Sequence, residues 1–451
     1  MSQDSQSEPI ISVSGLRGII GTQLTPLVAC RYVSAYATTL PAGGKVVIGR
    51  DGRQSGSMIC EVVSATLAAH GIEPVYLGVA STPTVGVEVR SQGAVGGIQV
   101  SASHNPKQYN GLKLFGGEGR VLPAVQGEPI LAGYREGKAA WVDVDLLRET
   151  SHTADAHAKH HDLILTTVDV DRIREKKFKV LLDSNNGAGS LLGRRLLETL
   201  GCDVTVFGET PNGKFTHVPE PTAANLTSVC SMVTEGGFDV GFCQDPDADR
   251  LAVIDEQGTY IGEELTLALC LKQVLPTEQG TVVTNCATSS VAKHLANEFG
   301  CQVKQSAVGE ANVCDLMIAE DAVFGGEGNG GPIDPRVGYV RDSFVGMARI
   351  LDLMATSGET ISQHVASMPP LAIVKDKLEM DTAGLPALFE KLISAMPDAQ
   401  AGKPDGLKLD WGDRWLLVRG SNTEPIVRFI SEAPTTAEAQ ALCDAGKRLA
   451  D

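Results

Sequence analysis

The stretch "KVVIGRDGRQSG" (residues 45–56) decides the fold, because an apolar strand-like run passes directly into a polar, glycine-containing turn. Two later stretches repeat this order, "FKVLLDSNNGAGS" (178–190) and "GTVVTNCATSS" (280–290). Each is followed by a helical pattern, a second strand that opens on glycine, another helical pattern and a third strand. Runs of Val and Ile that alternate with helical patterns indicate parallel sheets with right-handed crossovers. We therefore predict an α/β protein with three similar α/β domains, whose sheets are mixed but mostly parallel.

The last part of the chain breaks this pattern. The segments 371–380 and 406–433 have the alternation typical of antiparallel strands, and 436–449 has helical spacing. This part predicts a smaller C-terminal α+β domain. We place the domains at 1–155, 156–262, 263–372 and 373–451.

Composition excludes several classes of protein. The chain has 451 residues and a formal net charge of −17, which argues against binding to nucleic acid or to an anionic membrane. No apolar run approaches the ~18 residues of a membrane span. The N-terminal "MSQDSQSEPI" lacks the basic and apolar regions of a secretory signal. The ten cysteines show no metal-site spacing and are expected to be reduced thiols of a cytoplasmic protein. The oligomeric state is not readable from these features.

Polar loops follow the third strand of each repeat. They are "SASHNP" (101–106), "QDPDADR" (244–250) and "GEGNGG" (326–331). Ligands of open α/β sheets bind outside the carboxyl ends of the strands, so three domains around a cleft would bring these loops together. The first loop leaves two interpretations open: an ordinary polar turn, or a serine, Ser103, presented for chemistry.

The second loop carries three carboxylates at alternate positions, Asp245, Asp247 and Asp249. Carboxylates this close repel one another unless they share a cation, and hard oxygen ligands suit Mg²⁺ or Ca²⁺. A calcium-binding helix-loop-helix does not fit, because Arg250 stands where that loop needs glycine and a strand-like run follows. Arg250 adds a phosphate or carboxylate ligand beside the metal. A solvated acidic turn is the alternative.

Ser103 needs a setting that activates it. No GxSxG elbow is present, so a serine that carries phosphate beside a divalent metal is the better hypothesis. Lys113 could transfer the proton, or could be an ordinary surface lysine of a strand. His104 is a further catalytic candidate, or a residue that only shapes the loop.

Two more segments could bind the parts of a sugar phosphate. "RGSNTEP" (419–425) gathers a guanidinium, hydroxyls and an amide into a phosphate cradle, which Arg428 could join. In "GGEGNGG" (325–331), glycines allow close approach to a ligand, and a carboxylate and an amide could bind vicinal hydroxyls. The alternatives are a simple turn and a flexible linker. The candidate ligand-binding residues are Arg419, Ser421, Asn422, Thr423, Arg428, Glu327 and Asn329.

The four loops, in this order over essentially the whole chain, resemble the α-D-phosphohexomutase family, which includes phosphoglucomutase, phosphomannomutase and phosphoglucosamine mutase. The resemblance implies four domains around a central cleft, of which the first three share a fold. It implies that Ser103 carries a phosphate and that Mg²⁺ is held by the three aspartates and a phosphoserine oxygen. It implies that the sugar hydroxyls meet Glu327 and Asn329. The substrate phosphate would meet Arg419, Ser421, Asn422 and Thr423. Arg17, in "SGLRGIIG", matches an arginine near the reacting phosphate, and Lys113 matches the acid/base.

The implied reaction interconverts hexose 1-phosphate and hexose 6-phosphate. Phosphoserine gives its phosphoryl group to the sugar, the 1,6-bisphosphate turns over, and the other phosphate returns to Ser103. A hexose 1,6-bisphosphate would activate the enzyme, and hexose phosphates are the expected partners. The sequence departs from many relatives at Gly331, where a histidine is common, and at Ala307, where a lysine is common.

The preferred hexose is not fixed by the motifs. Glu327 would attract an ammonium group, which favours glucosamine slightly over glucose and mannose. Two other classes of function stay open: a phosphatase that passes the phosphoryl group from serine to water, and a non-catalytic sugar-phosphate binder.

Overall fold

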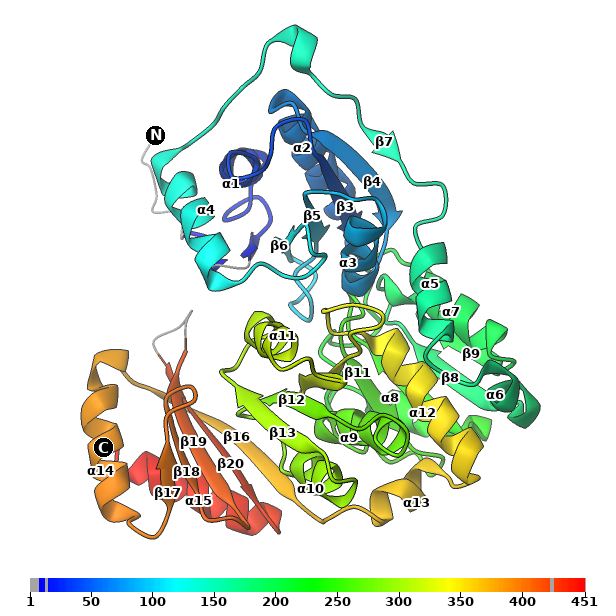
Figure 1. Cartoon of the computed structure of the whole chain (residues 1–451), viewed down its shortest axis with the longest axis vertical. Helices are drawn as coiled ribbons and strands as arrows, with labels where there is room; N and C mark the ends of the chain where they lie inside the picture. Colours follow the sequence, from blue (N-terminus) through cyan, green and yellow to red (C-terminus); the bar gives the residue numbers. More distant parts are fainter. Residues whose placement is uncertain (1–7, 13–14, 422–425, 451) are drawn as a thin grey trace.

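The computed structural model describes residues 8–12, 15–421 and 426–450 of the chain. Its strands form four sheets, and we name the parts that carry them the first to fourth units in chain order. Figure 1 shows the first unit at the top, the second and third below it, and the fourth at the lower left. Within the described residues, no helix combines the length and the apolar character needed to cross a bilayer.

The first unit is built on a seven-stranded sheet of order β1-β2-β6-β5-β3-β4-β7. Alternate residues of β3 face opposite sides, so that Val46 and Ile48 pack with α1 and α2 while Val47 packs with α3. The elements are β1 (Ile10–Ser12), β2 (Gly15–Ile19), α1 (Pro26–Ala37), β3 (Lys45–Arg50), α2 (Gly56–Ala69), β4 (Glu73–Val79), α3 (Thr82–Ser91), β5 (Gly96–Val100), β6 (Tyr109–Gly116), α4 (Ala124–Glu136), a 3₁₀ turn η1 (Val144–Leu146) and β7 (Ser151–His152).

The second unit has a four-stranded sheet of order β11-β10-β8-β9. Strands β8, β9 and β10 are parallel, and β11 turns back antiparallel to β10. Its elements are α5 (Ala158–Leu165), α6 (Val170–Lys176), β8 (Lys179–Asp183), α7 (Gly189–Thr199), β9 (Asp203–Phe207), α8 (Thr227–Gly236), β10 (Val240–Gln244) and β11 (Leu251–Ile254).

The third unit repeats this arrangement in the order β13-β12-β14-β15. Its last strand, β15, again lies antiparallel to the third one, β14. Its elements are α9 (Glu263–Val274), β12 (Thr281–Asn285), α10 (Val291–Glu298), β13 (Gln302–Ser306), α11 (Glu310–Ala319), β14 (Phe324–Glu327), β15 (Gly331–Ile333), α12 (Ser343–Ser357) and α13 (Ile361–Ala366).

The fourth unit is an antiparallel sheet of order β16-β20-β19-β18-β17. It contains a helix, α14, that the sequence did not predict, as well as the predicted C-terminal helix, α15. Its elements are β16 (Ala372–Glu379), a 3₁₀ turn η2 (Thr382–Gly384), α14 (Leu385–Ala395), β17 (Gln400–Gly402), β18 (Leu407–Asp410), β19 (Trp415–Gly420), β20 (Ile426–Ala433) and α15 (Thr436–Arg448).

The predicted repeat is confirmed, and the structure adds a strand to it. In each of the first three units the strand order is second, first, third, and then an antiparallel fourth strand, as in β4-β3-β5-β6. The polar loops join the third strand to the fourth, so all of them lie at the carboxyl end of a third strand. The predicted domain boundaries stay a prediction; each sheet falls within one predicted domain except for Ala372, the first residue of β16.

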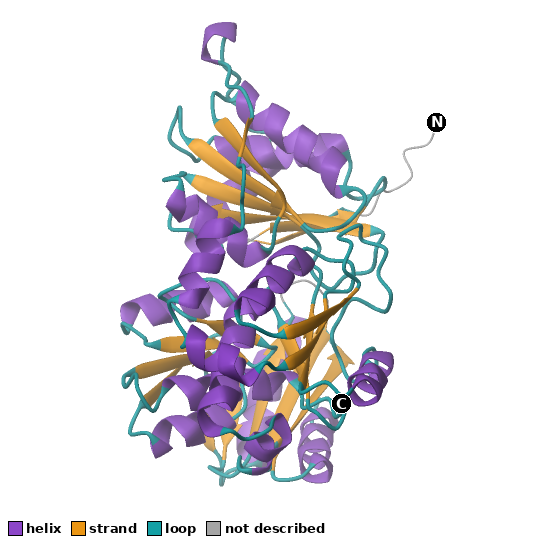
Figure 2. Ribbon diagram, turned by 90° about the vertical axis from the view of Figure 1, so that its right-hand side faces the viewer, coloured by secondary structure: helices purple, strands orange, loops and turns teal. Residues whose placement is uncertain are grey.

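The hydrophobic cores show how the units are joined. One core continues from the second unit into the third, through residues such as Leu182, Phe242, Leu267 and Phe344, and it includes Val87 of α3. The first and fourth units keep cores of their own. Figure 2 shows the sheet of the first unit lying between helices, above the two units that share a core. Helix α3 therefore joins the first unit to the shared core.

Candidate active site

Ser103 lies at the junction between the first two units. It is 2% exposed, and its Oγ donates to Asp245 Oδ2 at 2.9 Å. His104 Nδ1 lies 3.3 Å from the same Oγ, and the backbone N–H of Ser103 donates to Ser101 Oγ at 2.9 Å. The φ angle of Ser103 is +49°, which is uncommon for a residue with a side chain and is kept only where neighbours hold it. The loop thus presents the serine to the acidic loop.

Arg53 holds this serine loop in place, although no motif in the sequence had selected it. The residue is 2% exposed, and its Nε donates to Asp51 Oδ2 at 3.0 Å. The same Asp51 oxygen accepts from Ser101 Oγ at 2.7 Å. Its other donors reach the carbonyl oxygens of Ser103 (2.7 Å), Asn105 (2.6 Å), Pro106 (2.8 Å) and Tyr109 (3.2 Å). One guanidinium thereby fixes the backbone on both sides of the candidate nucleophile.

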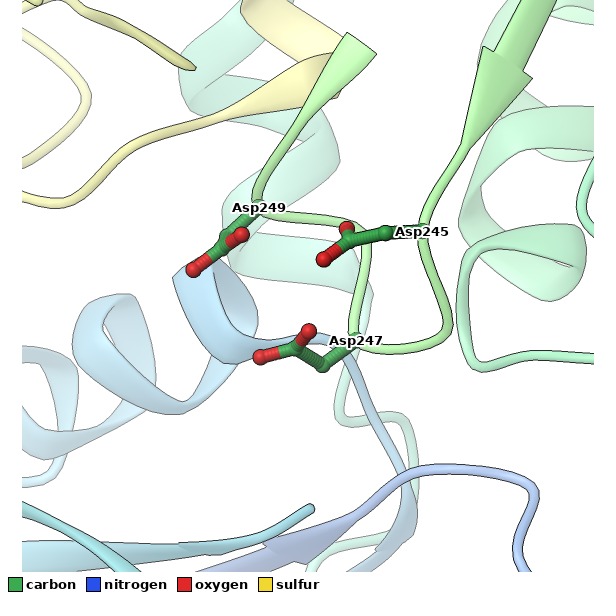
Figure 3. A group of neighbouring side chains, drawn as sticks. All are labelled: Asp245, Asp247 and Asp249. Carbon is green, nitrogen blue, oxygen red and sulfur yellow. The ribbon is translucent and has the colours of Figure 1, made fainter. Parts of the chain in front are cut away.

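The three aspartates form one buried cluster. Asp245, Asp247 and Asp249 are each 0% exposed, and a set of one oxygen from each lies within 4.8 Å of one another. Figure 3 shows the three carboxylates converging from the short loop between β10 and β11. Burial and repulsion from the other two carboxylates raise the pKa of Asp245 well above its usual range. Three ionised carboxylates at this place are therefore energetically unfavourable unless cations compensate their negative charge.

The cluster fits a divalent cation. Asp247 Oδ1 and Asp249 Oδ1 are buried and have no hydrogen-bond partner among the described residues. Their other oxygens are fixed from outside: Asp247 Oδ2 accepts from Thr82 Oγ1 at 2.5 Å, and Asp249 Oδ2 accepts from Arg341 Nη2 at 2.6 Å. Each carboxylate is therefore oriented with one oxygen left for a ligand. Hard carboxylate oxygens of this kind suit Mg²⁺.

Lys113 binds the acidic loop as well. From β6 its Nζ donates to Asp249 Oδ2 at 2.9 Å and to Asp247 Oδ2 at 3.3 Å. Burial opposes the charge of Lys113, but Asp249 and Asp247 outweigh it and raise its pKa above the usual lysine value. The surface-lysine alternative is wrong, because this side chain is only 14% exposed and paired with two buried carboxylates.

Positive charge surrounds the serine loop. Arg17 Nη1 donates to Asn105 Oδ1 at 3.3 Å, and Arg250 Nε is buried without a hydrogen-bond partner among the described residues. Burial, followed by Arg250 and Arg17, lowers the pKa of His104 to about 3. His104 is therefore neutral at neutral pH. Neutral His104 and cationic arginines beside Ser103 favour an anionic group at this place.

Glu327, in the predicted sugar loop, is 3% exposed and hydrogen-bonded on both oxygens. Its Oε1 accepts from Asn285 Nδ2 at 2.8 Å and from the Gly309 N–H at 3.2 Å. Its Oε2 accepts from Arg341 Nη1 at 2.8 Å and from Asn329 Nδ2 at 3.4 Å. Asn329 Oδ1 is buried without a partner among the described residues. Arg341 thus joins the sugar loop to Asp249 of the acidic loop.

The predicted phosphate cradle is described only in part. Arg419 is 9% exposed, and its Nε lies 2.7 Å from Asp405 Oδ2. The same Asp405 oxygen accepts from the Val308 N–H at 3.2 Å, which links the fourth unit to the third. Ser421 follows β19, and the exposed Arg428 lies opposite Arg419 on β20. Asn422 and Thr423 lie outside the described residues.

The structure therefore brings the predicted residues of the first two units together around Ser103 and joins the sugar loop to them through Arg341. The described contacts of Arg419 are with its own unit and do not reach the serine loop. Three residues that sequence reasoning missed are added to the site. The added residues are Arg53, Thr82 and Arg341. Arg53 had a usable signal, because it stands in the turn after the first strand of the repeat. Thr82 and Arg341 had none, since their partners lie 165 and 92 positions away along the chain.

Comparison with known families covers nearly the whole chain. The family model described as phosphoglucomutase/phosphomannomutase, alpha/beta/alpha domain I, matches residues 9–140. Models of domain II, domain III and the C-terminal domain of the same family match residues 158–258, 263–371 and 374–447. The four matches follow one another in the order of the four units.

Individual relatives agree. A phosphoglucomutase/phosphomannomutase of Thermococcus kodakarensis is 33% identical over 446 residues, which are 96% of this chain and 97% of the relative. A protein of Methanopyrus kandleri named "Probable phosphoglucosamine mutase" is 31% identical over 435 residues, 96% of this chain and 95% of the relative. The crystal structure of a phosphoglucomutase/phosphomannomutase family protein from Burkholderia thailandensis is 25% identical and covers 99% of this chain and 97% of its own, with a TM-score of 0.86.

Four α/β and α+β units with these loops define an isomerase of the phosphohexomutase class, an enzyme that transfers a phosphoryl group within a sugar phosphate. The chain belongs to the phosphoglucomutase/phosphomannomutase family, the α-D-phosphohexomutases.

Proposed function

We propose that this enzyme interconverts hexose 1-phosphates and hexose 6-phosphates through a phosphate carried on Ser103 Oγ. The observation that carries the proposal is the contact of 2.9 Å between Ser103 Oγ and Asp245, inside the acidic cluster and beside cationic side chains. A phosphoryl group on this oxygen would lie next to the aspartates. Phosphoryl transfer depends mainly on positioning and on charge compensation, which such a site supplies.

The proposed chemistry consists of two transfers of opposite direction. In the first, the bond between phosphorus and Ser103 Oγ breaks as a bond to the free sugar hydroxyl oxygen forms, which gives the 1,6-bisphosphate. The Lys113 cation gives its proton to Ser103 Oγ as that oxygen leaves, and the neutral amine then takes the proton of the attacking hydroxyl, which restores the cation. After the bisphosphate has turned over, its other phosphate returns to Ser103 by the reverse steps.

Asp245, Asp247 and Asp249 would hold Mg²⁺, together with an oxygen of the phosphoserine. The cation would supply charge compensation for the phosphoryl oxygens. Arg17 and Arg250 would bind the reacting phosphate, with neutral His104 beside it. Glu327 and Asn329 would meet the sugar, and Arg419, Ser421, Asn422, Thr423 and Arg428 the distal phosphate. A hexose 1,6-bisphosphate would restore the phosphoenzyme, and a cytoplasmic location stays a prediction.

The preferred hexose stays open. A free carboxylate at Glu327 would attract an ammonium group and thereby favour glucosamine. Arg341 lies 2.8 Å from that carboxylate and compensates its charge, so this preference loses its basis. Relatives of similar identity carry the names of both kinds of mutase. We therefore propose hexose phosphates as the substrate class and leave glucose, mannose and glucosamine to assay.

The test measures phosphate on Ser103. We expect intact mass spectrometry to show the addition of one phosphate after incubation with glucose 1,6-bisphosphate and Mg²⁺, and peptide mapping to place it on Ser103. Ser103→Ala should abolish both this addition and the mutase activity while the melting temperature stays close to that of the wild type. The exposed Ser57 of α2 gives the matched control, since Ser57→Ala should keep both.

Coupled assays on glucose, mannose and glucosamine 1-phosphates complete the test. Mutase turnover retained by Ser103→Ala would overturn the assignment of the nucleophile. Steady release of inorganic phosphate without isomerisation would identify a phosphatase instead. Absence of both phosphate uptake and turnover would identify a sugar-phosphate binder.

A further inference from the structure

Arg341 occupies a central position between two loops of the site. It lies after β15 and just before α12, and its side chain is 9% exposed. Nη1 donates to Glu327 Oε2 at 2.8 Å and Nη2 donates to Asp249 Oδ2 at 2.6 Å. Its backbone N–H donates to Glu310 Oε1 at 2.9 Å. One guanidinium thus connects the candidate sugar loop directly to the candidate metal loop.

Glu327 depends on Arg341 for its charge balance. The other three donors to this carboxylate are the side-chain amides of Asn285 and Asn329 and the backbone N–H of Gly309, which are all neutral. Among the described residues, Arg341 is the only cation that forms an ion pair with Glu327. A buried carboxylate is strongly unfavourable unless a cation or several hydrogen bonds compensate it. Without Arg341, only neutral donors would remain on Glu327, so its negative charge would act more strongly on a cationic sugar.

The chain leaves space for this arginine at Gly331. A Cβ atom added at Gly331 would lie 2.3 Å from Arg341 Cδ and 2.7 Å from its Cγ. Any side chain at position 331 would therefore displace the stem of Arg341. The Arg341 side chain therefore occupies the space that Gly331, at the start of β15, leaves open.

We propose that Arg341 sets the sugar specificity of the site: by pairing with Glu327, it lowers the efficiency of an ammonium sugar relative to a hydroxyl sugar. This inference rests on the proposed function, because it takes Glu327 to face the hexose. The carboxylate then meets the sugar as one member of an ion pair and not as a free anion. Arg341 also ties the position of Glu327 to Asp249, so that it is a positioning residue for the sugar loop.

The main variant is Arg341→Met, which keeps an unbranched side chain and removes the charge. The measured quantity is the ratio of kcat/KM for glucosamine 1-phosphate to kcat/KM for glucose 1-phosphate. We expect this ratio to rise about tenfold over the wild type, which is the scale of one charge-assisted hydrogen bond between the ammonium group and the freed carboxylate. A ratio of two substrates on one preparation does not depend on the fraction of folded enzyme.

A second variant displaces Arg341 without removing it. Gly331→Ala should push the guanidinium away from Glu327 and raise the same ratio, by less than Arg341→Met does. Glu327→Gln provides the matched background. With no carboxylate left to neutralise, adding Arg341→Met to Glu327→Gln should leave the ratio unchanged.

Each result supports or overturns the inference. A ratio that stays at the wild-type value in both Arg341→Met and Gly331→Ala overturns it. An equal rise in the Glu327→Gln background also overturns it, because Arg341 would then act through another group. Dissociation constants of glucosamine 6-phosphate and glucose 6-phosphate, measured by calorimetry, give the same ratio without turnover. A wild type that binds both sugars but turns over neither would refute the proposed function and leave this binding ratio as an independent test.

Discussion

The conformation of Ser103 is maintained by neighbours and not by its own preference. A residue with a side chain at φ +49° carries backbone strain, which persists only where surrounding contacts determine the geometry. Arg53 provides four of these contacts through backbone carbonyls, and Asp51 holds the arginine. The position of the candidate nucleophile therefore depends on a residue that does not touch the acidic cluster.

We predict that Arg53→Met lowers kcat about 100-fold, since a displacement of the reacting atom by about 1 Å has an effect of this size. It also leaves Asp51 buried without its cation, which should destabilise the first unit by about 3–5 kcal/mol. Scanning calorimetry would show a lower transition temperature for that unit.

Arg50→Met is the matched control, because Arg50 on β3 bonds to Tyr76 and to the Asp51 carbonyl but to no residue of the serine loop. It should lose much less activity. An Arg53→Met enzyme with wild-type kcat would show that the loop holds its shape without the arginine.

At the scale of single elements, helix α3 supports the acidic loop. Ser81 caps the helix by accepting from the Thr84 N–H, and Thr82 begins it. The Thr82 N–H donates to the Asp247 carbonyl at 2.9 Å, and its Oγ1 donates to Asp247 Oδ2 at 2.5 Å. A helix N-terminus stabilises a neighbouring carboxylate through its free N–H groups and its dipole. The first turn of α3 therefore orients Asp247 toward the cation site.

The opposite side of this turn is fixed by His160 of α5. Its Nδ1 lies 2.9 Å from Thr84 Oγ1, and its Nε2 lies 2.7 Å from Asp342 Oδ2. Asp342 in turn caps α12. Three helices from three units thus meet directly behind the acidic loop, which explains how separate units hold one set of ligands.

We predict that Thr82→Val weakens binding of a divalent cation by about 10–100-fold, the usual effect of removing a group that orients a ligand. Valine has the shape of threonine but no hydroxyl, so Asp247 Oδ2 loses its donor. Electron paramagnetic resonance of Mn²⁺ titrated into the protein measures this affinity without any assay of turnover.

Thr82→Ser keeps the hydroxyl and should bind Mn²⁺ nearly as the wild type does. Equal affinities in Thr82→Val and the wild type, at equal melting temperatures, would show that α3 only fills space behind the loop.

For the whole molecule, the contact between the third and fourth units contains a partly buried carboxylate. Glu264, in the first turn of α9, accepts from the Ser289 N–H at 2.9 Å and lies 3.4 Å from Lys375 Nζ on β16. These residues line a cavity of about 350 Å³ between the units. Burial raises the pKa of Glu264 to about 7, although Lys375 and the Ser289 N–H act in the opposite direction.

This carboxylate should make stability depend on pH. Because the pKa is higher in the folded than in the unfolded protein, the folded state binds more protons between pH ~4.3 and about 7, and stability falls as pH rises through that range. We predict that the melting temperature of Glu264→Gln minus that of the wild type is larger at pH 8 than at pH 5.

The exposed Glu298 at the end of α10 supplies the control, since Glu298→Gln should show the same difference from the wild type at both pH values. A constant difference for Glu264→Gln would mean that Glu264 remains ionised across this range.

The sequence determined the architecture and the chemistry of the loops. Apolar strand runs followed by glycine-rich turns predicted the three repeats, since hydrophobic periodicity and turn chemistry are local properties. It also predicted that the polar loops follow the third strands, and it selected Ser103 and the three aspartates. The sequence indicated a strand around Lys113 and another after Arg250, but not their antiparallel pairing with the third strands, because pairing is a tertiary contact. Strand β15 and helix α14 were not predicted, because a strand of three residues and a single amphipathic helix carry weak local signals.

The tertiary structure decided what those residues contact. Thr82 and Arg341 bind Asp247 and Asp249, which lie 165 and 92 positions away along the chain, so no local pattern marks them. Arg53 does stand in a recognisable place, the turn after the first strand of the repeat, but its contacts with the serine loop appear only in the fold. The charge of Glu327 shows the difference most clearly: its sequence context predicts a free carboxylate that attracts an ammonium group, whereas in the fold it forms an ion pair with Arg341. Local sequence specifies which groups enter a site, and packing between units decides their orientation and charge balance, because distances between remote residues exist only once the chain has folded.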